Sequence, residues 1–331
     1  MGHRVRQHMD TTIELIPAIP LGLRDAAQQG LLVPFIGAGV SRLAGSPGWA
    51  DFADGVLRKL VDDNQLSYAD IEVLRHLSPR VKLSLAQTIT KQQIDYSKLL
   101  NTDDQKKKDL GNRLYRALSK LGKTFITTNY DDWLDNMNFP EPTAVDISST
   151  TVKTPNEPTQ MNVVWTKEAF VKSLFQQNTV IHLHGSVKDQ KSMVLTVSDY
   201  VRHYANDRGA DTENPVLTLL ENLFQNRTVL FVGYGVEEYE LLEPIIMKAQ
   251  GSGGEQPVRH YLLQGFFSHE KSLMRSLHEY YLNQLGILLI PFQRDKKDRD
   301  QLVDVLEAFA EQIPASAPSM LQKLIDMEDL L

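Results

Sequence analysis

Residues 31–41 read LLVPFIGAGVS, an apolar run that stops at two closely spaced glycines. Similar apolar runs, each ending in or near Gly, Asn or His, occur at 124–126, 180–183, 229–232, 260–263 and 286–290. Continuous apolar strands are typical of a parallel sheet that helices cover on both faces. Helical patterns alternate with these runs at 49–62, 110–121, 215–224 and 269–285. The chain is therefore predicted to be an α/β protein with a Rossmann-like, doubly wound parallel sheet.

Two regions interrupt this alternation. Residues from about 67 to 121 have a helical pattern throughout, which predicts a helical layer inserted into the fold. Residues 139–162 are rich in Pro, Thr, Ser and Asn, and they predict a loop over one edge of a pocket. After Pro314 the chain is amphipathic, with Leu321 and Leu324 at helical spacing. This last piece either packs on its own domain, as most apolar stripes do, or docks on a neighbouring subunit.

The composition limits the classes of function. The chain has 331 residues, a net charge of −7 and no cysteine. The lack of cysteine excludes disulfides, thiolate catalysis and a zinc site built on cysteine. A negative net charge argues against nonspecific binding of nucleic acid, which needs a basic surface. With no signal peptide or membrane-spanning run in the sequence, we expect a cytoplasmic protein without a membrane or direct nucleic-acid partner.

The glycine motif at 37–41 follows a predicted strand and leads into a helix. Gly37 and Gly39 carry no side chain that would block the approach of backbone N–H groups to a pyrophosphate, and Ser41 adds a hydroxyl donor. The strict dinucleotide pattern G-x-G-x-x-G is not met, because Arg42 stands at the third glycine position. The motif alone favours nucleotide binding only weakly.

Two polar motifs follow later strands. Residues 127–131 read TTNYD, so Asn129 and Asp131 would lie at the carboxyl edge of the sheet, where ligands bind in open α/β folds. Alternatively, Asn129 caps the next helix with help from Asp131. Residues 182–186 read HLHGS; His182 is deeper in its strand and is predicted to be structural, whereas His184 beside Gly185 is predicted to face the cleft as a base. A metal site is not predicted, because no third ligand joins the two histidines.

The order of these motifs resembles that of the sirtuin family, in which Gly-Ala-Gly-x-Ser, Thr-Gln-Asn-x-Asp and His-Gly follow one another. The resemblance extends over about residues 30–295 and includes VLT at 194–196 and the glycine turn FVGYG at 231–235. It implies that NAD is the substrate, that Asn129 orients the nicotinamide ribose, and that His184 is the general base. It also implies cofactor-binding roles for Gly37, Ala38, Gly39, Ser41, Asp131, Gly233, Tyr234 and Gly235. We accordingly divide the chain into an N-terminal segment (1–28), a sirtuin-like NAD-binding catalytic domain (29–297) and C-terminal helices (298–331).

Departures from the family pattern narrow the expected activity. Protein deacylases of the family carry a four-cysteine zinc ribbon, whereas this chain has no cysteine. Thr128 stands where the family motif Thr-Gln-Asn-x-Asp has Gln. The chain is thus similar to bacterial sirtuin-like effectors of anti-phage abortive infection, which hydrolyse NAD to ADP-ribose and nicotinamide. That resemblance implies a homo-oligomer and a partner, either a HerA-type ATPase or an Argonaute-like or other phage sensor. The alternatives are a noncatalytic NAD or ADP-ribose sensor, and a protein deacylase or ADP-ribosyltransferase.

Overall fold

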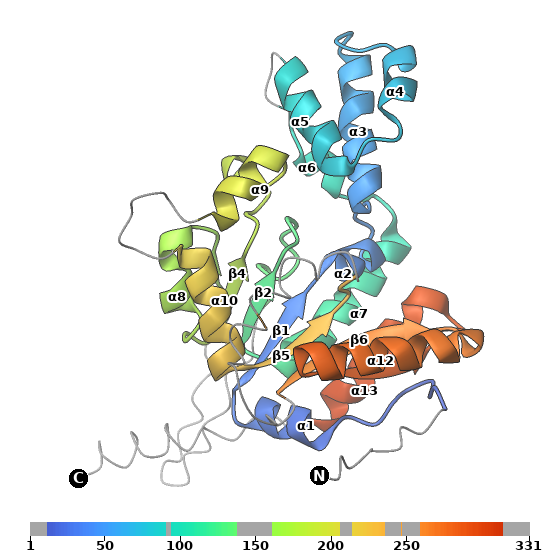
Figure 1. Ribbon diagram of the computed structural model, residues 1–331, viewed down its shortest axis with the longest axis vertical. Coiled ribbons are helices and arrows are strands. Elements are labelled where there is room, and N and C mark those ends of the chain that lie inside the picture. Colours follow the sequence, from blue (N-terminus) through green and yellow to red (C-terminus); the bar gives the residue numbers. More distant parts are fainter. Residues whose placement is uncertain are drawn as a thin grey trace, which may run out of the picture.

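The computed structural model describes residues 12–90, 94–137, 161–205, 214–235, 246 and 259–313. Within these residues the centre of the molecule is a seven-stranded sheet in the order β3-β4-β2-β1-β5-β6-β7, with every neighbouring pair parallel (Figure 1). Its strands are β1 (Leu32–Ile36), β2 (Thr124–Thr127), β3 (Asn162–Val164), β4 (Thr179–His182), β5 (Thr228–Val232), β6 (His260–Phe266) and β7 (Ile287–Gln293). The predicted doubly wound parallel sheet is confirmed.

The strands form where the sequence is continuously apolar. All residues of β1 and β4 are buried, as expected for strands covered on both faces. Each apolar run named above forms one of these strands, whereas β3 was not identified because it is only three residues long. It lies at the edge of the sheet beside β4. Of the loop predicted at 139–162, residues 139–160 lie outside the described residues, and Asn162 begins β3.

Two helical layers sandwich the sheet. Along β1 and β5, Ile36 and Val232 point into one core, whereas Phe35 and Phe231 point into the other. The first core is closed by α1 (Leu21–Gln28), α2 (Ala38–Leu43), α7 (Gln105–Leu121) and α13 (Gln301–Gln312). The second is closed by α8 (Phe170–Ser173), α10 (Pro215–Asn226) and α12 (Lys271–Leu285). Burial of each large apolar side chain stabilises the fold by about 1.5–3 kcal/mol, so both layers are held mainly by apolar contact.

A group of helices projects beyond the carboxyl ends of the strands (Figure 1). It consists of α3 (Trp49–Asp62), α4 (Tyr68–Leu74), α5 (Pro79–Ile89) and α6 (Ser97–Leu100), and we call it the helical module. The module has its own apolar core, which includes Phe52 and Leu83, and an ion pair of 2.6 Å joins Lys82 to Asp54. The predicted insertion at 67–121 contains α4 to α6 and also α7, which packs on the sheet instead.

The strand order creates a switch point at β1. From β1 the chain continues to β2 on one side, and later it returns to β5 on the other side. In such sheets the carboxyl ends next to the switch point form the ligand crevice. The ends of β1, β2, β4 and β5 therefore lie together, and each is followed by one of the motifs quoted above. Next to this edge lies α9 (Val197–Tyr204), between the module and α10 (Figure 1).

The remaining elements complete the scaffold. Short 3-10 helices occur at Lys167–Ala169, Gln190–Ser192, Ser268–Glu270 and Asp298–Asp300. An ion pair of 2.7 Å between Arg113 and Glu307 joins α7 to α13. The amphipathic piece predicted after Pro314 lies outside the described residues. Within the described part of the chain, no helix has both the length and the apolar character needed to cross a membrane.

Candidate active site

The glycines of the first motif and of the later turn meet each other. Gly37 donates its N–H to the last carbonyl of β5 at 2.9 Å, and Gly39 donates its N–H to the Gly233 carbonyl at 2.8 Å. A Cβ on Gly39 would lie 2.7 Å from that carbonyl oxygen, and one on Gly233, which has φ 67°, would lie 2.6 Å from the Val40 nitrogen. Only glycine permits this backbone contact between two turns. The N–H groups of Gly37 and Gly39, which were expected to face a pyrophosphate, thus form hydrogen bonds within the protein.

Asn129 follows β2 and is held by three hydrogen bonds. Its N–H donates to Thr127 Oγ1, its carbonyl accepts from His182 Nδ1, and its side-chain Nδ2 donates to the Gly37 carbonyl, each at 3.0 Å. Among the described residues, none hydrogen-bonds to Asn129 Oδ1. This oxygen is therefore available as an acceptor for a ligand in the cavity that Asn129 lines.

His184 lies in the turn that follows β4. Its Nε2 is 2.8 Å from the Tyr204 hydroxyl, and its ring contacts those of Tyr200 and His203, so α9 supplies all three neighbours. Burial lowers the pKa of His184 well below its usual value, and the charges of His203 and Arg80 act in the same direction. The imidazole is consequently neutral at pH 7 and can accept a proton.

Asp131 connects the loop after β2 to the glycine motif. Ser41 Oγ donates to Asp131 Oδ2 at 2.5 Å, and the Trp133 N–H donates to Oδ1 at 3.3 Å. Burial raises the pKa of Asp131, although the hydrogen bond from Ser41 opposes this effect. The pair is buried, yet both side chains contribute to the cavity wall. A ligand that reaches them meets a hydroxyl and a carboxyl group already hydrogen-bonded to each other.

One cavity brings most of the predicted residues together. Asn129 and His184, predicted as catalytic, both line it. Of the predicted cofactor-binding residues, it is lined by Ala38, Ser41, Asp131 and Tyr234. The other predicted residues do not line it: Gly37, Gly39, Gly233 and Gly235. The first three form the backbone contact beside the cavity, and Gly235 is exposed at the end of a described segment.

The residues of the outer wall of the cavity were not predicted from the sequence. The wall is mainly aromatic and includes one cation, with contributions from Trp49, Phe52, Arg80, Tyr130, Tyr200 and Tyr204. The Arg80 guanidinium lies 3.9 Å from the centre of the Tyr200 ring, a cation–π contact between the helical module and α9. The spacing of Tyr200 and Tyr204, one helical turn apart, is a signal in the sequence, whereas nothing near Arg80 indicates the site.

Comparison with models of known families shows that residues 123–290 match the SIR2-like domain. The chain belongs to this family. The match covers about half of the 331 residues and contains Asn129, His184 and the glycine turn at Gly233, whereas the motif at 37–41 precedes it. No curated protein matches the chain. The sirtuin-like character predicted from the motifs is confirmed, and it indicates an NAD-related function.

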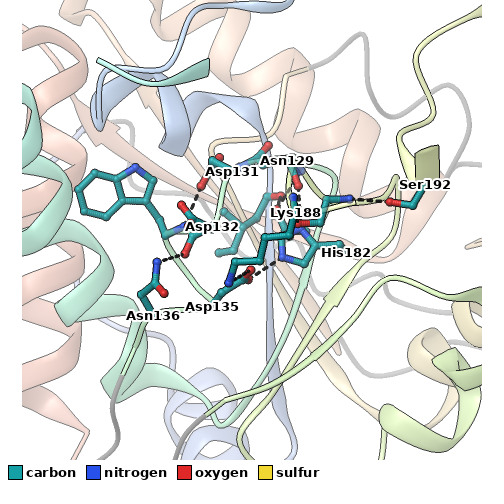
Figure 2. A network of polar contacts seen from close by, with 12 residues as sticks. Asn129, Asp131, Asp132, Asp135, Asn136, His182, Lys188 and Ser192 are labelled. Carbon is teal, nitrogen blue, oxygen red and sulfur yellow. Dashed lines mark hydrogen bonds and ion pairs between the residues drawn. The ribbon is translucent and has the colours of Figure 1, made fainter. Parts of the chain in front are cut away.

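Behind Asn129, the SIR2-like domain contains a buried charged network (Figure 2). His182, the last residue of β4, has Nδ1 at 3.0 Å from the Asn129 carbonyl and Nε2 at 2.7 Å from Asp135 Oδ1. Lys188 Nζ lies 2.9 Å from Asp135 Oδ2 as an ion pair. The side chains of His182 and Asp135 are both 0% exposed, so this histidine does not reach the cavity. The two histidines of the motif therefore occupy different environments.

A bound metal ion needs several donor side chains around one point. In the part of the chain that the structure describes, no group of three or more His, Asp or Glu side chains is placed to hold a metal ion. His182 uses both ring nitrogens within the protein, and His184 uses Nε2 toward Tyr204. The polar groups of the cavity are instead an amide, hydroxyls, an imidazole and a carboxyl, which suit a ribose or a carboxamide.

Proposed function

We propose that this SIR2-like domain hydrolyses NAD at the bond between nicotinamide and ribose. The observation that carries the proposal is that Asn129 and His184, from the ends of neighbouring strands, line one cavity, where His184 is kept neutral. The family membership supports NAD as the ligand. An uncharged imidazole and an amide with a free oxygen are the groups that a ribose undergoing substitution at its anomeric carbon requires.

The chemistry balances with water as the only co-substrate. The bond between C1′ and the ring nitrogen breaks, and its electron pair neutralises the pyridinium, so nicotinamide leaves uncharged. Water adds to C1′ through an oxocarbenium-like state, giving ADP-ribose. The proton of the water passes to His184, whose Nε2 is already hydrogen-bonded to Tyr204. Because the leaving group is activated by its own charge, positioning and a base suffice.

Other residues of the cavity have supporting roles. Asn129 Oδ1 accepts a hydrogen bond from a ribose hydroxyl and so orients the sugar. Asp131 and Ser41 offer hydrogen-bonding groups to the nicotinamide carboxamide or to a phosphate oxygen. The aromatic wall excludes water from the face of the ribose that reacts. Ala38 and Tyr234 complete the wall next to the glycine turns. Together these groups bind the substrate around the reacting carbon.

The test is NAD consumption by the purified protein, with products resolved by chromatography. We expect nicotinamide and ADP-ribose from the wild type, and kcat lower by at least about 100-fold for Asn129→Ala and for His184→Ala. Tyr280→Phe, at a partly exposed position on α12, is the matched control and should leave kcat unchanged. Full activity of His184→Ala would refute its role as base. NAD binding without turnover, alone or with a partner, would favour a noncatalytic sensor.

The biological setting is part of the same proposal. An enzyme that destroys NAD must be held inactive in a growing cell, and the resemblance to anti-phage effectors supports control by assembly. We therefore propose a homo-oligomer activated by a HerA-type ATPase or another phage sensor. Addition of the partner to the NAD assay tests this directly, because the rate of hydrolysis should be higher with the partner than without it.

A further inference from the structure

We propose that His182 is a positioning residue: it is held as a doubly protonated imidazolium by Asp135 and Lys188, and it fixes the backbone of Asn129. The kinetic part of this inference rests on the proposed function. The structural part depends only on the buried network in Figure 2. None of the three residues lines the cavity, so their effect on the reaction must pass through Asn129.

The protonation state follows from the partners of the ring. Nδ1 faces the Asn129 carbonyl, which can only accept, so Nδ1 must carry a proton. Nε2 faces Asp135 Oδ1, and the other oxygen of that carboxyl group is paired with the Lys188 ammonium. A carboxyl beside an ammonium is ionised and also accepts, so Nε2 carries a proton as well. Both nitrogens therefore donate.

The charges around the ring agree with this assignment. Burial alone lowers the pKa of His182, but the hydrogen bond and charge of Asp135 outweigh it and raise the pKa above its usual value. The buried Asp131 carboxyl acts in the same direction. Burial raises the pKa of Asp135, but His182 and then Lys188 lower it overall. The Tyr115 hydroxyl lies 3.5 Å from Asp131 Oδ1, and burial raises the pKa of this phenol, so it adds no charge at neutral pH.

The network does something that apolar packing cannot. A buried ion pair is commonly no more stabilising than apolar residues of similar volume, because both charges lose their hydration. An apolar residue at 182, however, has no donor for the Asn129 carbonyl. With the bonds to Thr127 and Gly37, the bond from His182 fixes the Asn129 peptide and its amide plane. The ion pair thus makes His182 a rigid, charged donor.

Two amide variants separate positioning from mere stability. In His182→Asn the side-chain NH2 takes the place of Nδ1 and can still donate to the Asn129 carbonyl. In His182→Gln the NH2 takes the place of Nε2, so it reaches Asp135 but not Asn129. Both variants remove the ring and the charge. Positioning predicts that kcat of the Gln variant is at least about tenfold below that of the Asn variant, with similar KM for NAD. Equal kcat values would overturn the role.

Ring nitrogen signals supply a second measurement. In protein with 15N-labelled histidine, with His182→Asn used for assignment, we expect both His182 nitrogens to be protonated at pH 7. A neutral His182 ring at pH 7 would overturn the proposal even if a variant fails to fold. If the wild type hydrolyses NAD neither alone nor with the partner, the proposed function fails, whereas this spectrum still decides the charge of His182. A neutral His184 in the same spectrum is the internal reference.

Discussion

His182 and His184 are separated by one residue, yet the structure gives them opposite properties. His182 ends β4 within a layer of charged groups and has a raised pKa, whereas His184 lies in the next turn among aromatic rings and has a lowered one. Burial lowers the pKa of both, so burial does not distinguish them. The difference is Asp135, whose carboxylate is 2.7 Å from His182 Nε2 and does not act on His184. The neighbouring carboxylate thus decides whether the pKa of each histidine is raised or lowered.

The largest contrast should be in stability. Replacing His182 by Ala leaves the buried Asp135 charge with one partner fewer, and should reduce the free energy of unfolding by about 3–5 kcal/mol. Replacing His184 by Ala removes one hydrogen bond at the cavity wall and should cost about 1 kcal/mol. Urea denaturation followed by circular dichroism measures both. Equal losses would contradict the assignment of charge to His182 alone.

The cost of His182→Ala should also depend on pH. Because the folded pKa of His182 lies above the unfolded value, its stabilisation is fully present below the unfolded pKa of about 6.5. It is lost as the pH rises through the folded pKa. The gap in unfolding free energy between wild type and variant should therefore narrow on the alkaline side. A gap that widens on the alkaline side would show that folding lowers the pKa of His182 instead of raising it.

A smaller effect should follow from removing the hydroxyl that contacts His184. Tyr204→Phe keeps the ring in the aromatic wall and deletes the 2.8 Å hydrogen bond to Nε2. A hydrogen bond of this kind contributes about 1 kcal/mol, so we expect kcat to fall roughly fivefold with KM little changed. Steady-state NAD hydrolysis, again with Tyr280→Phe as control, measures the change. An unchanged kcat would mean that Tyr204 does not assist the base.

The smallest effect concerns the pH profile. His184, the proposed base, must be neutral to accept a proton, and its pKa lies well below the usual value, so kcat should be retained below pH 6.5. Arg80 contributes to that lowering as a nearby cation, after burial and His203. In Arg80→Met the pKa of His184 should rise, and the acid limb of kcat should move to higher pH. If the acid limb of the kcat profile does not move, burial and His203 alone are sufficient to lower the pKa of His184.

Much of the scaffold could be predicted from sequence, because local patterns decide it. Continuous apolar runs predicted the strands, and 49–62 was predicted with the bounds that α3 has. The different environments of His182 and His184 were predicted because Gly185 suggested that the strand ends there; its φ is 84°. The roles of the predicted site residues remain predictions.

Features that depend on contacts between distant segments were missed. Asp135 and Lys188 carry no local signal, and they form a network only because β2 and β4 are neighbours. Arg80 reaches the cavity from the helical module, more than one hundred residues from its ring partner Tyr200 in the sequence. The N–H groups of the glycine motif were expected to face a pyrophosphate, but those of Gly37 and Gly39 bond to carbonyls at the end of β5 and just after it, and sequence patterns cannot pair β5 with β1.

The pairing of β2 with β4 has a consequence for the placement of the two side chains proposed to be catalytic, those of Asn129 and His184. Thr127 and His182 are register partners, and Asn129 and His184 each stand two positions beyond them. Their relative placement therefore depends on the register of the two strands as well as on the loops that follow them. A shift of one residue in this register would move one of the two loops along the sheet, relative to the other, by about 3.3 Å, the rise of one strand residue. Single-residue insertions at Phe125 or Val180 should therefore uncouple the two groups, which makes strand register a means of inactivation distinct from replacing either residue.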